Sequence, residues 1–257
     1  MKWLLAVNVG LVLAAHSAAP AAARPYAWPE GKRSAIVLTY DDSAPSQLQY
    51  AIPALDEAGL KGTFFLTGGN MTPESIAGWR AASELGHELA NHTLHHPCRR
   101  GTYDMPERNT SESYDVATML NEIRTMNAFL AAIDGRPTHA FGAPCGHTTV
   151  SGVDYYAPLI ASGMATFYRD EVAAPVSENP PIIMMTSPNE TSGAQMIQWV
   201  EQVRAAGALG VVVFHGVGGD HLAVSDEAHR ELLTHLAAHP DTWVATFNDA
   251  MSYIQAH

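Results

Sequence analysis

Short apolar runs alternate with amphipathic segments along nearly the whole chain, and this alternation constrains the fold more than any other feature. The runs are rich in β-branched and aromatic residues and have the length of buried strands. The longer segments between them repeat apolar residues at helical spacing, and several begin at a capping residue or end at glycine. Repeated strand–helix alternation predicts a mostly parallel sheet covered by helices.

The predicted strands are residues 35–40, 63–66, 87–90, 139–141, 165–168, 210–214 and 243–245, and the predicted helices are residues 47–58, 72–85, 116–133, 155–161, 194–206, 227–237 and 248–254. A further short apolar run, 182–185, lies in a stretch rich in Pro, Ser and Asn. No repeat or linker interrupts this order, and a chain of 257 residues can form one domain. We therefore expect residues 24–257 to be a single domain.

Residues 1–23 have the pattern of a secretory signal peptide. Lys2 provides a basic start, residues 3–15 are apolar, and residues 21–23 offer small side chains for cleavage. Polar residues and a proline interrupt the apolar stretch, which argues against a membrane anchor. We expect a mature protein that is secreted or periplasmic.

The net charge bears on the kind of partner. The whole chain carries a formal charge of −12, and removal of the signal segment takes away Lys2 and no acid, which leaves −13. A strongly acidic protein is a poor binder of nucleic acid and has no electrostatic attraction to an anionic membrane surface. Neutral or cationic substrates fit better.

Titratable side chains follow three of the predicted strands. Asp41 and Asp42 follow the first strand, His92 and His96 follow the third, and His215 follows the run at 210–214. In parallel barrels, the residues at the carboxyl ends of strands build the site. One carboxylate and two histidines can hold a divalent metal and leave positions open for water and substrate. The other carboxylate and the last histidine are then available as base and acid.

Each of these groups also has an ordinary structural interpretation. The two aspartates could cap the helix that follows them, although adjacent acids repel each other unless a cation is near. His92 and His96 would share a face on a helical turn, but surface histidines are common in a chain with 13 of them. His215 could be a strand-end histidine that bonds a carbonyl. The arrival of separate segments at one edge favours a site.

Together, these segments resemble the motifs of the polysaccharide deacetylase family, also called the NodB-homology family or carbohydrate esterase family 4. Its first motif, Thr-Phe-Asp-Asp, is similar to residues 39–42, and its second, His-Ser/Thr-x-x-His-Pro, is similar to residues 92–97. Its fifth motif, Leu-x-His, corresponds to Val-Phe-His at residues 213–215. The resemblance covers roughly residues 34–255.

The resemblance implies an α/β fold, a distorted (β/α) barrel of about seven strands. It also implies that Asp41 is the general base, that Asp42, His92 and His96 bind the metal, and that His215 is the general acid. Such a ligand set suits one divalent ion, and zinc fits it best.

The third and fourth motifs depart from the family pattern. The usual Arg-x-Pro-Tyr-Gly reads Gly-Ala-Pro-Cys-Gly from Gly142, so the arginine that orients the base is missing and Cys145 stands in the aromatic position. The backbone N–H of Cys145 can still serve as the oxyanion donor. Arg136 or Arg169 could replace the missing arginine, and Asp170 is the nearest candidate for the carboxylate partner of the acid.

Cys98 and Cys145 are the two cysteines of the chain. In an oxidising compartment they could form a disulfide beside the site, or they could remain two free thiols, because pairing depends on geometry.

The expected function is the metal-dependent removal of N- or O-linked acetyl groups from an oligo- or polysaccharide. An inactive carbohydrate-binding barrel and an amidase that acts on a non-acetyl C–N bond are the alternatives. Four side chains could contact sugar or could equally pack in the core: Tyr103, Tyr114, Tyr155 and His221.

Overall fold

The computed structural model describes residues 26–170 and 180–257. The predicted signal segment, residues 1–23, lies outside the described residues. None of the described helices combines the length and the apolar character needed to cross a bilayer.

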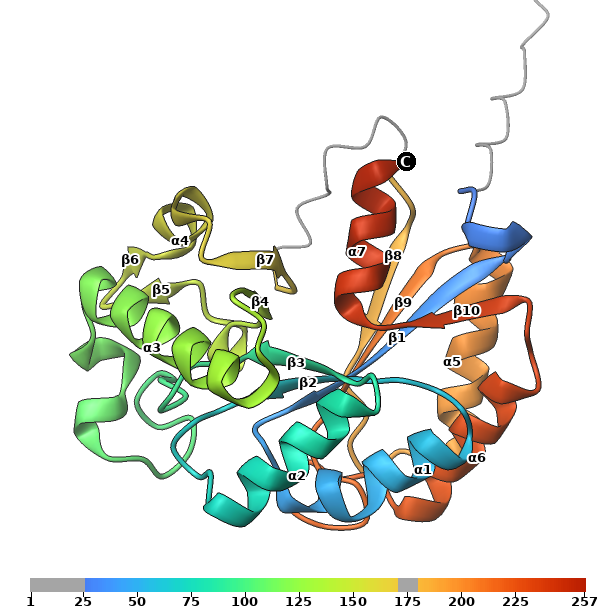
Figure 1. The fold of residues 1–257 in the computed structure, drawn as a ribbon, viewed down its shortest axis with the longest axis horizontal. Coiled ribbons are helices and arrows are strands. Elements are labelled where there is room, and N and C mark those ends of the chain that lie inside the picture. The colour runs from blue at the N-terminus through green and yellow to red at the C-terminus, as the bar shows by residue number, and fades with distance from the viewer. Residues whose placement is uncertain (1–25, 171–179) are drawn as a thin grey trace, which may run out of the picture.

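A curled parallel sheet runs through the molecule, and helices cover it (Figure 1). Seven strands follow one another in the order β7-β4-β3-β2-β1-β9-β8, and β10 pairs with β1 beside this path. Strand β1 pairs with β9 on one side, and on the other side with β10 over its first half and β2 over its second half. This is the distorted barrel of about seven strands that the sequence predicted.

The strands of this sheet are β1 (Ser34–Asp41), β2 (Thr63–Leu66), β3 (Glu88–Asn91), β4 (His139–Phe141), β7 (Ala165–Tyr168), β8 (Ile183–Thr186), β9 (Leu209–Phe214) and β10 (Thr242–Ala245). The helices are α1 (Ile52–Glu57), α2 (Pro73–Glu84), α3 (Val116–Asp134), α4 (Tyr156–Ser162), α5 (Gly193–Ala206), α6 (Asp226–Ala237) and α7 (Phe247–Ala256). A small antiparallel hairpin, β5 (Thr149–Val150) and β6 (Val153–Asp154), was not expected from the sequence.

Both faces of β1 are buried, which explains its continuous apolar run. Ile36, Leu38 and Tyr40 point into a core cluster that includes residues of α1, α2, α3, α5 and α6. Ala35 and Val37 point to the opposite face, where α7 packs. Successive strand residues alternate between faces, so a strand covered on both sides needs apolar residues at every position.

Helix α2 shows how local sequence sets an element boundary. The Thr72 side chain accepts a hydrogen bond from the backbone N–H of Ser75, the Ser75 hydroxyl lies within hydrogen-bond distance of the Thr72 N–H, and Pro73 occupies the first helical position. This reciprocal capping satisfies N–H groups that have no partner inside the helix. The helix therefore begins where the sequence predicted.

Candidate active site

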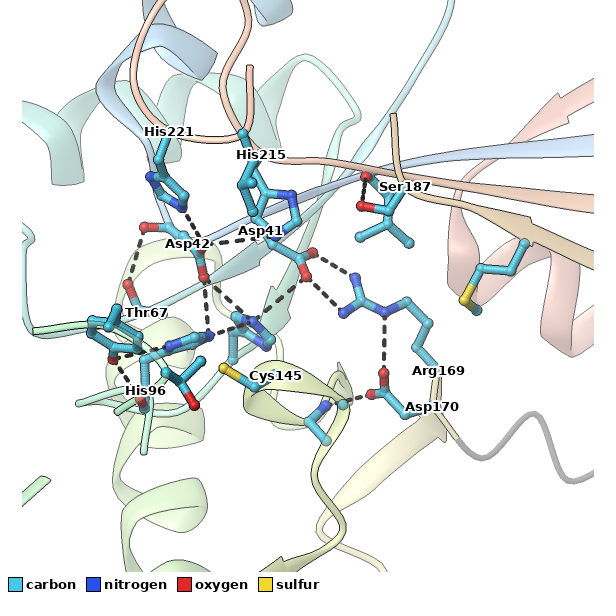
Figure 2. Close-up of a pocket in the computed structure, with 18 of the residues that line it drawn as sticks. Asp41, Asp42, Thr67, His96, Cys145, Arg169, Asp170, Ser187, His215 and His221 are labelled. Atoms are coloured by element: carbon cyan, nitrogen blue, oxygen red, sulfur yellow. Dashed lines mark hydrogen bonds and ion pairs between the residues drawn. The ribbon is translucent and has the colours of Figure 1, made fainter. Parts of the chain in front are cut away.

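The carboxyl ends of β1, β3 and β9 bring the predicted site residues to one edge of the sheet. Asp41 is the last residue of β1, His92 directly follows β3, and His215 directly follows β9. They line a cavity of about 900 Å³ together with Asp42 and His96 (Figure 2).

The loop that carries His92 and His96 is not a helical turn, and this part of the sequence interpretation was wrong. Thr93 and His96 have positive φ angles of 68° and 52°, so the chain folds back irregularly. Asn91 Oδ1 accepts a hydrogen bond from the Thr93 N–H at 2.8 Å, and Thr93 Oγ1 accepts one from the His96 N–H at 3.0 Å. Pro97 also disfavours helical backbone at His96. The two imidazoles converge because side chains hold this loop.

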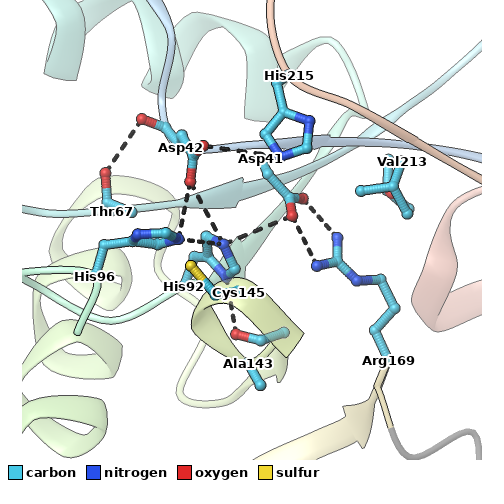
Figure 3. A network of polar contacts seen from close by, with 12 residues as sticks. Asp41, Asp42, Thr67, His92, His96, Ala143, Cys145, Arg169, Val213 and His215 are labelled. Carbon is cyan, nitrogen blue, oxygen red and sulfur yellow. Dashed lines mark hydrogen bonds and ion pairs between the residues drawn. The ribbon is translucent and has the colours of Figure 1, made fainter. Parts of the chain in front are cut away.

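Three ligand atoms form a triangle with the dimensions of a metal site (Figure 3). Asp42 Oδ1 lies 3.5 Å from His92 Nε2 and 3.2 Å from His96 Nε2, and the two nitrogens are 3.2 Å apart. A tetrahedral ion with bonds of about 2.0–2.1 Å needs ligand atoms roughly 3.3–3.4 Å apart. Asp42 Oδ1 is buried and has no hydrogen-bond partner among the described residues. The three residues therefore fit a single divalent cation.

Further contacts prepare both imidazoles for this role. His92 Nδ1 lies 2.8 Å from the carbonyl oxygen of Gly142, which can only accept, so Nδ1 carries the proton and Nε2 presents its lone pair. Tyr103 donates its hydroxyl proton to the His96 carbonyl at 2.8 Å and lies 3.2 Å from His96 Nδ1. Burial, assisted by the neighbouring His92, lowers the pKa of His96 to about 4, so this imidazole is neutral near pH 7. Outer contacts of this kind orient ligand histidines.

The Asp42 carboxylate lies among imidazoles. Burial would raise its pKa, but a hydrogen bond from His221 and the proximity of His92 and His96 bring the pKa of Asp42 far below its ordinary value. The carboxylate is therefore ionised and suited to bind a cation.

Asp41 forms a two-point contact with an arginine from the end of another strand. Arg169, directly after β7, donates to Asp41 Oδ1 at 2.5 Å and to Oδ2 at 2.7 Å, and both side chains are buried. Burial alone would raise the pKa of Asp41, but Arg169, with a contribution from His92, lowers it. Arg136, the other arginine considered from the sequence, lies at the end of α3, where its backbone N–H bonds Asp134.

The glycine at position 142 leaves room for this arginine. A Cβ atom on Gly142 would lie 3.0 Å from Arg169 Nη2 and 2.9 Å from Phe65 Cδ1. The Arg169 guanidinium also lies 4.3 Å from the centre of the Phe65 ring. The space beside Asp41 is thus filled from β7, and a side chain on residue 142 would compete for it.

The turn after β4 carries Cys145, which is joined to Cys98 in a disulfide. Cys145 has a φ of 55°, and its backbone N–H makes no hydrogen bond to any residue that the structure describes. The bond ties this turn to the loop of the two metal-site histidines. Of the two alternatives that the sequence left open for the cysteines, the structure has the disulfide.

Asp170 supports the same turn. It accepts hydrogen bonds from the backbone N–H of Ala143 and from the Tyr156 hydroxyl, the latter at 3.2 Å, and its Oδ1 lies 3.9 Å from Arg169 Nε. Within the described ranges, none of its contacts is to His215, which the sequence considered as its partner. Its position connects the Cys145 turn with the arginine that holds Asp41.

His215 lies beside Asp41 and Asp42, and Figure 2 shows the Asp41 carboxylate between it and Arg169. Its Nε2 is 3.9 Å from Asp42 Oδ2, and its buried Nδ1 has no partner among residues 26–170 and 180–257. Burial lowers the pKa of His215, whereas Asp41 and Asp42 act in the opposite direction. The Gln47 side chain donates to the backbone carbonyl oxygens of both Asp41 and His215, at 2.5 and 2.9 Å, and so ties the two strand ends together.

Two of the four candidate sugar-contact residues line the cavity, and both also touch metal-site residues. Tyr103 holds His96, and His221 lies 2.7 Å from Asp42 Oδ2. Tyr114 and Tyr155 are instead buried in a core cluster around α3 and α4. Tyr103 and His221 act from loops and Gln47 from the helical segment Gln47–Ala51 that leads into α1, and no sequence motif marked any of them.

The comparisons with known proteins agree with this geometry. The sequence matches the polysaccharide deacetylase family over residues 29–158, just over half of the chain. No curated protein matches the chain by sequence.

Several solved structures share the fold at low sequence identity. The catalytic domain of a peptidoglycan N-acetylglucosamine deacetylase from Eubacterium rectale is 17% identical with a TM-score of 0.59, and the match covers 89% of this chain and 94% of that one. A family 4 acetyl xylan esterase from Clostridium thermocellum, in complex with a cobalt ion, is 18% identical with a TM-score of 0.55 and coverages of 86% and 91%.

A pseudoenzyme of the same carbohydrate esterase family, from Bacillus anthracis, is 14% identical with a TM-score of 0.57, and the match covers 87% of this chain and 66% of that one. The fold is therefore shared by active and inactive proteins, and the site residues of each chain have to be considered by themselves. The family match, the half-barrel sheet and the motif residues at its carboxyl edge agree: the chain belongs to the polysaccharide deacetylase family.

Proposed function

We propose that this protein is a metal-dependent hydrolase that removes N- or O-linked acetyl groups from a carbohydrate. The observation that carries the proposal is the triangle of Asp42 Oδ1, His92 Nε2 and His96 Nε2, with edges of 3.2–3.5 Å, beside the Asp41–Arg169 pair. A carboxylate and two imidazoles for the cation, and a second ionised carboxylate next to it, are the parts that metal-assisted hydrolysis requires.

Asp41 acts as the general base. A divalent ion held by Asp42, His92 and His96 would polarise the water and the acetyl carbonyl. Asp41 takes a proton from this water as it attacks, and Arg169 keeps both carboxylate oxygens in place during the transfer. Because Arg169 lowers the pKa of Asp41, the base is ionised near neutral pH.

The Cys145 turn and His215 act on the developing charge and on the leaving group. Cys145 lines the same cavity, and its backbone N–H, which makes no hydrogen bond to the described residues, donates to the tetrahedral oxyanion. His215 donates a proton to the departing sugar amine or hydroxyl, and acetate leaves. Burial disfavours the protonated form of His215, so the nearby carboxylates Asp41 and Asp42 are needed to support it.

Zinc is the proposed metal, because a tetrahedral site with two imidazoles and one carboxylate suits this ion. The proposed substrate is an acetylated oligo- or polysaccharide. The names of the similar structures include a peptidoglycan deacetylase and an acetyl xylan esterase, which supports this substrate class. We also propose that the mature protein acts in the periplasm or outside the cell, where the disulfide would be maintained.

The inactive-barrel alternative rested on the missing arginine at position 142. Arg169 provides the bidentate contact to Asp41, so this reason for inactivity is removed. An amidase that acts on another C–N bond would use the same groups, and the choice of substrate separates it from a deacetylase.

The decisive experiment measures acetate release from acetylated chito-oligosaccharide and from acetylated xylan by the purified protein. We expect release that a chelator abolishes and that added Zn²⁺ restores. His92→Ala should bind no metal and lose turnover on the order of 10³-fold or more, since the metal supplies several kcal/mol. Its circular dichroism spectrum should be that of the wild-type protein. Unchanged acetate release after complete metal removal would refute the metal-dependent reaction. No acetate release from either substrate by the Zn²⁺-loaded protein would refute the deacetylase and leave the amidase or the inactive barrel.

A further inference from the structure

The two oxygens of Asp42 lie in different surroundings. Oδ1 faces His92 and His96 and has no hydrogen-bond partner among the described residues. Oδ2 lies 2.7 Å from His221 Nε2 (Figure 2). We propose that His221 is a positioning residue, which holds Oδ2 so that Oδ1 alone is presented to the metal. This inference rests on the metal site of the proposed function.

The contact of His221 restrains a carboxylate that could otherwise rotate. An aspartate can bind a cation through one oxygen or both, and only one oxygen fits the triangle with the two imidazoles. A donor on the other oxygen makes one-oxygen binding the stable arrangement. A neutral imidazole with its proton on Nε2 can donate this bond, and so can a charged one, so the contact does not require ionisation.

The loop after β9 is built in a way that places His221 over Asp42. The Gly216 N–H donates to the His221 carbonyl at 3.1 Å, and a Cβ atom on Gly216 would lie 2.0 Å from the carbonyl oxygen of Gly219. Asp220 Oδ2 accepts a hydrogen bond from the Ser46 N–H at 2.8 Å, which ties the loop to the segment that follows Asp42 in the sequence.

The residues on both sides of His221 have unfavourable backbone conformations. Asp220 has a φ of 65°, and Leu222 has a φ of 45°. Left-handed backbone at residues other than glycine costs on the order of 1 kcal/mol or more and persists where the surroundings enforce it. Such strain on either side of one histidine indicates that its direction matters.

Two simpler interpretations of His221 do not account for its position. Its side chain is 56% exposed, so it contributes little to the core. It is also not part of the group formed by Asp42, His92 and His96, whose ligand atoms all lie within 4.8 Å of one another. Its close contact is to the oxygen that faces away from that group.

The test measures Zn²⁺ binding to the metal-free protein in the absence of any substrate. His221→Ala should weaken Zn²⁺ binding roughly 10- to 100-fold, as measured by competition with a chromophoric chelator. His221→Gln, whose amide can donate to Oδ2, should recover most of this loss. His95→Ala is the control, because His95 is an exposed histidine of the same metal-site loop that makes no side-chain contact to Asp42. It should bind Zn²⁺ as tightly as wild type.

Further outcomes would overturn the proposal. If His221→Ala lowers turnover while Zn²⁺ affinity stays at the wild-type value, His221 acts on the substrate and not on Asp42. X-ray absorption that finds three imidazoles on the bound zinc would make His221 a direct ligand. If wild-type protein binds Zn²⁺ tightly but releases no acetate, the proposed function fails, and the Zn²⁺ affinities of the two His221 variants alone decide the His221 inference. If His92→Ala binds Zn²⁺ as tightly as wild type, the ion lies elsewhere and both fail.

Discussion

Two buried carboxylates of the same parallel sheet differ in their ionisation. One lies at the carboxyl edge of the sheet, and the other lies at the amino edge. Asp41 is the last residue of β1, and Glu88 is the first residue of β3. They are 3% and 1% exposed, so water solvates neither of them. Arg169 and His92 nevertheless lower the pKa of Asp41, whereas burial raises the pKa of Glu88 to about 7.

The partners of the two carboxylates explain the difference. Asp41 receives two hydrogen bonds from the Arg169 guanidinium. Glu88 Oε2 receives bonds only from the neutral Thr63 hydroxyl and the Asn248 N–H, each at 2.9 Å, and its buried Oε1 has no partner in the part of the chain that the structure describes. Burial disfavours the charged form in both places. The Arg169 guanidinium bonds Asp41 directly and outweighs burial there, whereas Thr63, Asn248 and the more distant Arg136 lower the pKa of Glu88 too little to do so.

The largest expected effect in this comparison comes from Asp41→Asn. Loss of the general base should reduce turnover on the order of 10²-fold or more. The variant also leaves Arg169 buried without its charged partner, so the free energy of unfolding should fall by up to about 3–5 kcal/mol. Acetate release, Zn²⁺ content and urea unfolding together measure these effects. A wild-type rate with normal metal content would show that no protein base is needed.

The strand ends of this site could be predicted from the sequence, because each chemical residue directly follows an apolar run. That rule places Asp41, Asp42, His92 and His215 at one edge of the sheet from the sequence alone, and the structure has them there. It could not choose between Arg136 and Arg169, because the choice depends on which side chain reaches β1 from 128 residues away. The contact between Arg169 and Asp41 arises from the three-dimensional packing of the strands.

Loop conformation was the other part that the sequence could not provide. The pairing of His92 with His96 was expected on a helical turn, but left-handed residues at Thr93 and His96 bring it about. The contact of His221 with Asp42 depends in the same way on positive φ angles within a glycine-rich loop. Periodicity detects strands and helices, whereas single backbone reversals leave no repeating pattern.

A smaller effect is expected from a variant that weakens the hydrogen bonding of residue 169 to Asp41 but keeps the positive and the negative charge. Arg169→Lys retains the cation but cannot make two parallel hydrogen bonds to one carboxylate. Loss of one charge-assisted bond costs about 1.5–3 kcal/mol, so kcat should fall roughly 10- to 100-fold. Zn²⁺ affinity should stay unchanged, because Arg169 does not touch the three ligand residues.

Gly142→Ala provides an independent test of the contact between Arg169 and Asp41. The added methyl would lie 3.0 Å from Arg169 Nη2, so it should displace the guanidinium without removing any polar group. We expect a loss of kcat in the same direction as for Arg169→Lys. If Arg169→Lys is as active as wild type, the orientation of Asp41 does not limit the reaction.

Reduction of the disulfide should have a milder effect on turnover. The bridge between Cys98 and Cys145 links the loop of His92 and His96 to the turn proposed to donate to the oxyanion, across 47 residues of chain. The Cys98→Ser, Cys145→Ser double variant should lose several-fold in activity and about 2–4 kcal/mol in stability. Its far-ultraviolet circular dichroism should be retained. A free-thiol titration that finds two thiols in denatured, unreduced wild-type protein would show that the bridge does not form.

The smallest effect on turnover, and the most direct test of the comparison, is expected from Glu88→Gln. Its pKa of about 7 in the folded protein lies above the ordinary value of 4.5, so the folded state binds the Glu88 proton more tightly than the unfolded state. The stability that Glu88 contributes is therefore complete below about pH 4.5 and is lost as the pH rises through about 7, with a total of about 3 kcal/mol.

Glutamine does not titrate, and its amide oxygen can accept the bonds from Thr63 and Asn248. Urea unfolding of metal-free protein between pH 5 and 8 should show a decline in the wild type that is absent from Glu88→Gln and present in the control Glu84→Gln, an exposed residue on α2. Activity should be unchanged, because Glu88 lies at the edge of the sheet away from the site. An equal decline in both variants would mean that other groups set the pH dependence, and that burial without a cation does not keep Glu88 protonated.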